Sequence, residues 1–169
     1  MGKIAIFDLS DLIGYFRNAR LPTGIQRVQI ETVSALLRDS SARRRVWVCA
    51  FSEERDDWVR LDRTDFLDLA DAALASGDVS EPGWQARLDR LSEHLTLAPA
   101  LAFPTGAWLI NLGTSWWLQN YFLKVREARC RFGVRYVPFV HDMIPVMAPE
   151  HCVKPLVRDF VSWALGVFA

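Results

Sequence analysis

The chain has 169 residues, of which 51% are hydrophobic and 24% charged, and its 20 basic and 20 acidic side chains give a formal net charge of zero. This length suits one domain with a buried core (residues 1–169), and a composition with 7 Trp and 10 Phe excludes a disordered chain. A zero net charge supplies no overall field that attracts nucleic acid, so we expect no nucleic-acid partner.

Four apolar runs predict buried strands, because the strands of a parallel sheet are covered on both faces and read as continuous apolar sequence. They lie at residues 4–7, 46–51, 107–111 and 134–140. Pro138 removes a hydrogen-bond donor from the last run, which predicts an edge strand or a bulge. A weaker run at 58–61 predicts a further short strand.

Helical spacing and capping residues predict helices between these strands. We expect a short turn at 12–17, a helix from Thr23 to about Arg38, helices at 66–75 and 82–95, and one at 117–131 that ends at Gly133. The alternation of strands and helices predicts an α/β fold, with a Rossmann-like, doubly wound and mostly parallel sheet. The buried face of the helix from Thr23 is expected to contain Ile25, Val28, Thr32, Ala35 and Leu36.

The turn before the helix at Thr23 is a candidate anion site. Gly24 stands at the helix start, where free N–H groups and the positive end of the dipole favour a phosphate. Thr23 and Gln26 have the spacing of a capping box, so a capped helix with a glycine in a tight turn is an equally good explanation. Neither dinucleotide nor P-loop glycine fingerprints are present. The cations near this turn are Arg17, Arg20 and Arg27.

Polar residues follow three of the strands, at Asp8, Asn111 and His141, where ligands of open α/β sheets collect. His141 can donate to a sugar hydroxyl or carry a proton, and the Asp142 carboxylate can orient it, although a structural histidine explains the pair as well. The neighbouring strand ends on a second group with hydrogen-bonding side chains: Asn111, Thr114 and Ser115. The indoles that come next, Trp116 and Trp117, are able to stack on a sugar ring or to fill the core.

The three cysteines indicate a reducing, cytoplasmic environment. Cys49, Cys130 and Cys152 are far apart and form no CxxC pair, and His151 beside Cys152 has no partners for a metal site. The first apolar run is too short for a signal peptide, and no run of about twenty apolar residues predicts a membrane span.

Four motifs occur in order along the chain: FDLSDL at 7–12, TGIQRV at 23–28, LGTSWW at 112–117 and VHDMIP at 140–145. Together they resemble the amino-terminal half of bacterial GT-B glycosyltransferases, in particular the retaining mannosyl- and glucosyltransferases of surface polysaccharide assembly. Asp8-Leu9-Ser10 also resembles the aspartate pair of haloacid-dehalogenase phosphatases, but Ser10 replaces the second aspartate, so we set that reading aside.

The GT-B resemblance implies two Rossmann-like domains, of which this one receives the acceptor and the other binds most of the nucleotide sugar. It implies transfer of a sugar with retention to a glycan or lipid-linked acceptor, without a cofactor or an obligatory metal, at the cytoplasmic face of the inner membrane. It implies His141 as the catalytic residue at the donor sugar. Gly24, Thr23 and Arg27 would bind the donor diphosphate, and Asp142, Asn111, Thr114 and Ser115 would contact acceptor or sugar.

The sequence departs from that pattern, because no second domain and no pair of glutamates for ribose and sugar follow. We therefore expect this chain alone to be inactive, with residues 156–168 forming a core or interdomain helix that can promote self-association. An alternative is a non-catalytic module that binds a glycan or nucleotide and regulates a partner. A Rossmann dehydrogenase or epimerase is disfavoured by the missing glycine fingerprint.

Overall fold

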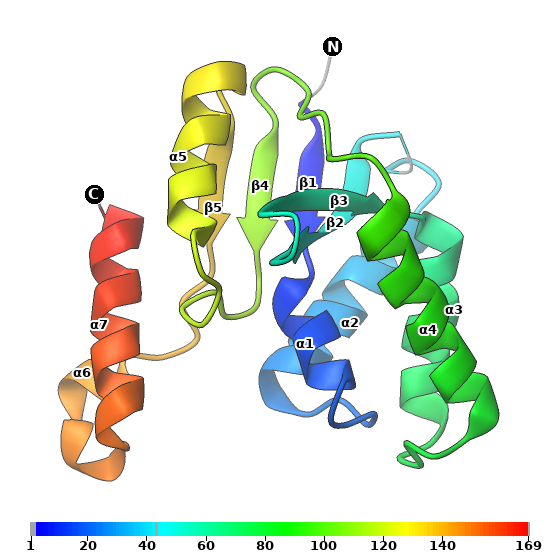
Figure 1. Ribbon diagram of the computed structural model, residues 1–169, viewed down its shortest axis with the longest axis horizontal. Coiled ribbons are helices and arrows are strands. Elements are labelled where there is room, and N and C mark those ends of the chain that lie inside the picture. The colour runs from blue at the N-terminus through cyan, green and yellow to red at the C-terminus, as the bar shows by residue number, and fades with distance from the viewer. Residues whose placement is uncertain (1–2, 43, 169) are drawn as a thin grey trace.

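The fold is built on one five-stranded sheet. The structure is a computed structural model that describes residues 3–42 and 44–168, and its strand order is β3-β2-β1-β4-β5 (Figure 1). All neighbours pair in parallel except β2 and β3, which are antiparallel. The strands are β1 (Ala5–Asp8), β2 (Val46–Ser52), β3 (Asp57–Leu61), β4 (Trp108–Asn111) and β5 (Arg135–Pro138).

Helices cover both faces of this sheet, as the α/β prediction requires. Successive strand residues alternate between two cores: Phe7 packs with α1 to α4, whereas Ile6 packs with α5. This mostly parallel, doubly covered sheet is compatible with a Rossmann-like fold. The helices are α1 (Ser10–Phe16), α2 (Gly24–Arg38), α3 (Arg63–Ala75), α4 (Pro82–Leu97), α5 (Tyr121–Phe132), α6 (Ile144–Met147) and α7 (Lys154–Phe168), with a 3-10 turn (Pro149–His151) before α7.

The strand register brings the carboxyl ends of three strands level with one another. Asp8 pairs with Asn111, and Asn111 pairs with Pro138, so the last residues of β1, β4 and β5 lie side by side. In Figure 1 the arrowheads of β4 and β5 point toward the end of the molecule where α6 lies. Side chains that follow these strands therefore share one edge of the sheet.

Most predicted elements are confirmed within a few residues. β5 is the edge strand that Pro138 predicted, and Gly133 ends α5 in the left-handed conformation with φ 65°. Helix α5 begins at Tyr121 and not at 117, because Asn120 has a positive φ of 55° and Ser115 is held in a loop by other side chains. The antiparallel β3 confirms the strand predicted at 58–61.

Two expectations for α2 are wrong. The Thr23 side chain makes no capping hydrogen bond, and the amide of Gln26 reaches toward Asp11 instead of back to the helix start. The buried face is also displaced by one residue, which is a rotation of about 100° around the helix axis. It consists of Gln29, Ile30, Val33, Ser34 and Leu37 in place of the predicted set Ile25, Val28, Thr32, Ala35 and Leu36.

A membrane crossing has no candidate among the helices that the structure describes, since none combines the required length and hydrophobicity.

Candidate functional site

A cavity of about 270 Å³ opens beyond the carboxyl ends of β4 and β5. Its polar lining comes from Thr114, His141 and Asp142, and Ile25 in the first turn of α2 borders the same space. Apolar side chains of α6 and α7 form most of the remaining wall. The cavity thus lies where ligands of α/β sheets bind, and it joins the predicted α2 turn to the predicted histidine.

His141 is half-buried at the cavity, and a backbone carbonyl fixes its ring. Its Nε2 atom donates to the Leu112 carbonyl oxygen at 2.6 Å, which ties the end of β5 to the end of β4. Phe139 lies against the imidazole with 4.9 Å between ring centroids. Because Nε2 carries the proton of this bond, Nδ1 is the nitrogen left to meet a ligand when the imidazole is neutral.

The orienting role predicted for Asp142 is wrong. Its Oδ1 atom accepts a hydrogen bond from the backbone N–H of Ile144 at 3.0 Å, at the start of α6. The carbonyl of Leu112 orients His141 instead. Asp142 still borders the cavity, so its carboxylate contributes negative charge there.

The three residues predicted to bind a diphosphate lie on the surface beside the cavity. Gly24 has a φ of 51°, and a Cβ built on it would meet nothing within 4 Å, so its backbone is approachable. Thr23 and Arg27 are exposed. The Nε atom of Arg27 donates to Glu31 at 2.7 Å, so an internal carboxylate already balances this cation at the helix start.

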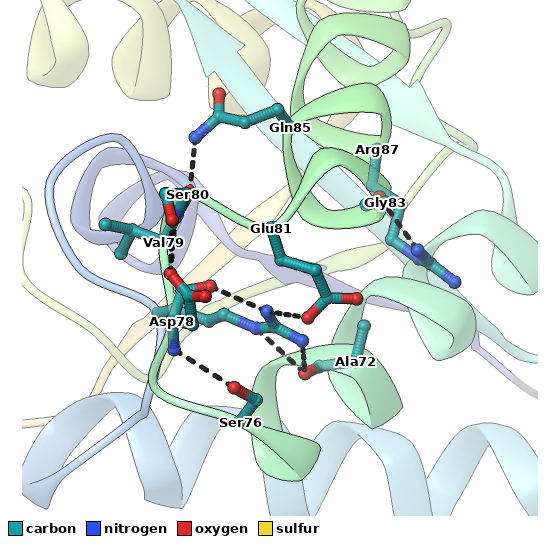
Figure 2. A network of polar contacts seen from close by, with 10 residues as sticks. Ala72, Ser76, Asp78, Val79, Ser80, Glu81, Gly83, Gln85 and Arg87 are labelled. Carbon is teal, nitrogen blue, oxygen red and sulfur yellow. Dashed lines mark hydrogen bonds and ion pairs between the residues drawn. The ribbon is translucent and has the colours of Figure 1, made fainter.

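Arg20, one of the three cations named near the candidate anion site, is not available to an anion. Only 3% of its surface is exposed, and its guanidinium donates to the carbonyls of Ala72 and Asp78 and to the carboxylate of Glu81. Figure 2 shows Ala72, Asp78 and Glu81 together in this network at the connection between α3 and α4. The Tyr15 hydroxyl donates to the Leu21 carbonyl at 2.6 Å. These bonds anchor the loop that leads to Gly24 at the start of α2.

Behind the cavity, Asp8 accepts hydrogen bonds from three side chains and one backbone N–H. Ser10 donates through its backbone N–H and its hydroxyl, Trp58 Nε1 donates at 2.8 Å, and the Tyr121 hydroxyl donates at 2.5 Å. Burial raises the pKa of the Asp8 carboxyl, and the four hydrogen bonds oppose that rise in part. Burial and the neighbouring Asp8 charge raise the pKa of Tyr121 well above its usual range.

Asn111 and Ser115 belong to the same buried layer, so their predicted ligand contacts find no support. Asn111 is 3% exposed, donates to the Tyr121 hydroxyl at 3.0 Å and accepts from the Gly113 N–H. Ser115 is 1% exposed and accepts a hydrogen bond from Trp163 Nε1 at 3.0 Å. Both side chains are used in hydrogen bonds that hold the loop after β4. Of the three ligand contacts predicted at this strand end, Thr114 is the one that lines the cavity.

Asp11 holds the cavity wall together, a role that the sequence indicated only through its place in the FDLSDL motif. One of its carboxylate oxygens accepts from the Thr114 hydroxyl, and the other accepts from Gln29 Nε2 at 2.7 Å. A Cβ on Gly113 would lie 2.5 Å from the Asp11 Cβ and 2.9 Å from the Gln29 amide. Only glycine allows α1, α2 and the loop after β4 to approach this closely.

Three aromatic rings form the far wall, and two of them were not predicted as site residues. Trp116 packs against Phe160 and Trp163 of α7, with ring centroids 5.6 Å and 5.8 Å away. Trp117, the other indole considered for sugar stacking, is partly exposed and lies against Gly14 outside the cavity lining. Apolar spacing in residues 156–168 was the only sequence signal for Phe160 and Trp163.

Within residues 3–42 and 44–168, no group of three or more His, Cys, Asp or Glu side chains gathers as a metal site. Cys152 is half-buried in the cavity wall, Cys130 is exposed on α5, and Cys49 is buried in β2. Comparison with protein-family models, with curated proteins and with solved structures found no match for this chain.

Proposed function

We propose that this chain is the acceptor-side, amino-terminal domain of a retaining GT-B glycosyltransferase that works in the cytoplasm. One observation carries the proposal: Ile25 in the first turn of α2 and His141 after β5 border the same cavity. These residues come from two of the four motifs that resemble the family, and they are more than a hundred positions apart in the sequence. The mostly parallel sheet is the architecture that such a domain requires.

In this proposal the domain supplies positioning and charge stabilisation. The donor diphosphate lies at Thr23 and Gly24, where an open backbone and the positive end of α2 favour an anion. His141, with Nε2 held by the Leu112 carbonyl, presents Nδ1 to a sugar hydroxyl. The acceptor enters the cavity beside Thr114 and Asp142. A second domain supplies most contacts to the nucleotide sugar, and the departing diphosphate helps to take the acceptor proton.

The first test measures transfer of a labelled sugar from UDP-glucose or GDP-mannose. The chain alone is expected to transfer none, because the proposal assigns most donor contacts to another domain. Turnover by the chain alone would contradict that assignment.

The decisive variant is His141→Ala, studied with the chain joined to its donor-binding half. Removal of a group that handles charge or a proton at the reacting sugar is expected to lower kcat by about a hundredfold or more. His94→Ala is the matched control, because the His94 ring is also bonded through Nε2 to a backbone carbonyl, that of Arg60, but lies on α4. Equal activities of the two variants would reduce His141 to a structural residue and remove the main support for the proposal.

A second variant tests the diphosphate site. Gly24→Ala is expected to raise KM for the nucleotide sugar with little change in kcat, because a methyl group here blocks close approach of phosphate. Binding of nucleotide or glycan by a protein that shows no transfer in any assembly would favour the alternative, a regulatory binding module.

A further inference from the structure

We infer that the cavity at His141 binds the apolar part of an uncharged amphiphilic acceptor, a hydroxylated head group that carries an aliphatic or aromatic portion. This inference rests on the proposed function and narrows its acceptor class. It comes from the cavity wall, in which a small polar end adjoins a large apolar surface.

The polar end of the cavity has few hydrogen-bonding side-chain groups left for a ligand. His141 uses Nε2 on the Leu112 carbonyl, and the Thr114 hydroxyl donates to Asp11. The remaining side-chain groups are the two lone pairs on the Thr114 oxygen, the free oxygen of Asp142 and His141 Nδ1, which the proposed function gives to a sugar hydroxyl. These groups suffice for one or two hydroxyls of a ligand but not for a sugar with all its hydroxyls buried.

The apolar end is large, and the indole donor of Trp163 is occupied. Trp163 gives its Nε1 hydrogen to Ser115, so the indole offers only carbon surface to the cavity. Phe160 and Trp116 continue this surface, and Leu156 and Ile144 line the cavity from α7 and α6. Apolar lining with a few convergent polar groups is typical of small-molecule sites.

The charges exclude a diphosphate from this space. Neither Lys nor Arg lines the cavity, and the Asp142 carboxylate does. An anionic group would face a like charge with no cation to neutralise it, at a cost that rises as water is excluded. The donor diphosphate therefore stays at the α2 turn, and a neutral ligand fits the cavity.

The volume of the cavity indicates that it holds a short apolar group of the ligand, whereas the rest of a longer apolar chain lies outside the cavity. The cavity of about 270 Å³ is near the lower end, about 300 Å³, of small-molecule sites. At its mouth Ile144 is 51% exposed, and Met147, one turn further along α6, is 79% exposed. A chain longer than the cavity can follow these side chains outward.

The test uses the rate of alkylation of Cys152 by iodoacetamide, because this thiol lines the cavity. Octyl β-glucoside, kept below its micelle-forming concentration, is the ligand probe. At about twice its Kd it should slow alkylation of Cys152 about threefold, by the factor 1 + [L]/Kd. Cys130 on the exposed side of α5 is the internal control and should react at an unchanged rate.

Two further probes separate the parts of the inference. Glucose has the same head without the tail and should give no protection at the same concentration. Octyl sulfate has the same tail with an anionic head and should protect less than octyl glucoside. Equal protection by glucose would overturn the inference that the cavity binds an apolar group. Stronger protection by octyl sulfate would overturn the inference that the ligand is uncharged.

A pair of variants localises the effect. Ile144→Trp fills the mouth of the cavity and should abolish protection, whereas Val146→Trp, on the same short helix but outside the cavity lining, should retain it. Protection that grows with protein concentration in the absence of octyl glucoside would mean that a second copy covers the cavity, which overturns the inference. Failure of every probe would also overturn it, while the transfer assays of His141→Ala and His94→Ala decide the proposed function separately.

Discussion

Asp8→Asn tests whether the buried hydrogen bonds at the end of β1 hold the site edge of the sheet together. In the wild type, one carboxylate oxygen accepts from Ser10 and the other accepts from Trp58 Nε1 and the Tyr121 hydroxyl. An asparagine keeps one oxygen for Ser10 and turns an NH2 group toward the other two donors. The Tyr121 hydroxyl can rotate and accept from that group, but its own hydrogen then loses its acceptor, and the indole N–H of Trp58 can only donate.

Two buried donors therefore lose the carboxylate as their acceptor, and each costs about 1 to 3 kcal/mol where it finds no other acceptor. Because the asparagine buries no charge, part of this loss is offset, and we expect about 1 to 3 kcal/mol of destabilisation at pH 7. Asp8→Ala leaves all the donors without an acceptor and should cost about 3 to 5 kcal/mol, a large part of a typical stability of about 5 to 15 kcal/mol. Urea unfolding followed by circular dichroism measures both changes.

The pH dependence gives the sharper readout. Burial raises the pKa of Asp8 in the folded protein above its ordinary value of 3.8, so the native state binds this proton more tightly than the unfolded state. The tighter proton binding by Asp8 stabilises the folded state. This contribution to the free energy of unfolding is complete below pH 3.8 and is lost as the pH rises through the pKa of Asp8 in the folded protein. The free-energy gap between wild type and Asp8→Asn should therefore widen when the pH is lowered from 7 toward 4.

Asp39→Asn is the matched control, because Asp39 also accepts from the N–H and the hydroxyl of the serine two residues later but is exposed. Hydrogen bonds from Ser41 lower the pKa of Asp39 below its ordinary value, so its stabilisation is present above pH 3.8 and lost on acidification. The two variants should show opposite pH trends. Equal stability of Asp8→Asn and wild type at pH 7, with a gap that stays constant on acidification, would refute the reasoning.

Two further pairs of variants probe the segments around the site, each by urea unfolding. Gly113→Ala places a methyl group 2.5 Å from the Asp11 Cβ and should cost about 1 to 3 kcal/mol by overpacking, whereas Gly24→Ala, with φ 51° and open space, should cost about 1 to 2 kcal/mol from backbone strain alone. A Gly113→Ala protein as stable as wild type would argue against the close approach. Arg20→Met leaves the buried acceptors of the α3–α4 connection without their donor and should cost about 2 to 3 kcal/mol, whereas Glu81→Gln, at the exposed end of that ion pair, should cost less than about 1 kcal/mol. The reverse order would contradict the role assigned to Arg20.

Local sequence was sufficient for most of the elements and for the edge of the sheet where polar residues gather. A continuous apolar run such as 107–111 indicates a strand that is buried on both faces. Pro138 indicates a strand without a partner on one side, because proline cannot donate a backbone hydrogen bond. Both signals act within a few residues of the chain. The predicted positions of His141 and Thr114 at strand ends follow from the same patterns. The level register of β4 and β5 then brings both residues to the same edge of the sheet.

Tertiary contacts decided which polar side chains face the cavity and which are used inside the protein. Ser115 is bonded to Trp163, 48 residues later, and Arg20 is bonded to the Ala72 carbonyl, 52 residues later. Asp8 meets Tyr121 across 113 residues. Hydropathy and spacing describe a residue and its neighbours along the chain, whereas the partner that satisfies a buried donor or acceptor comes from a distant segment and is known only after folding.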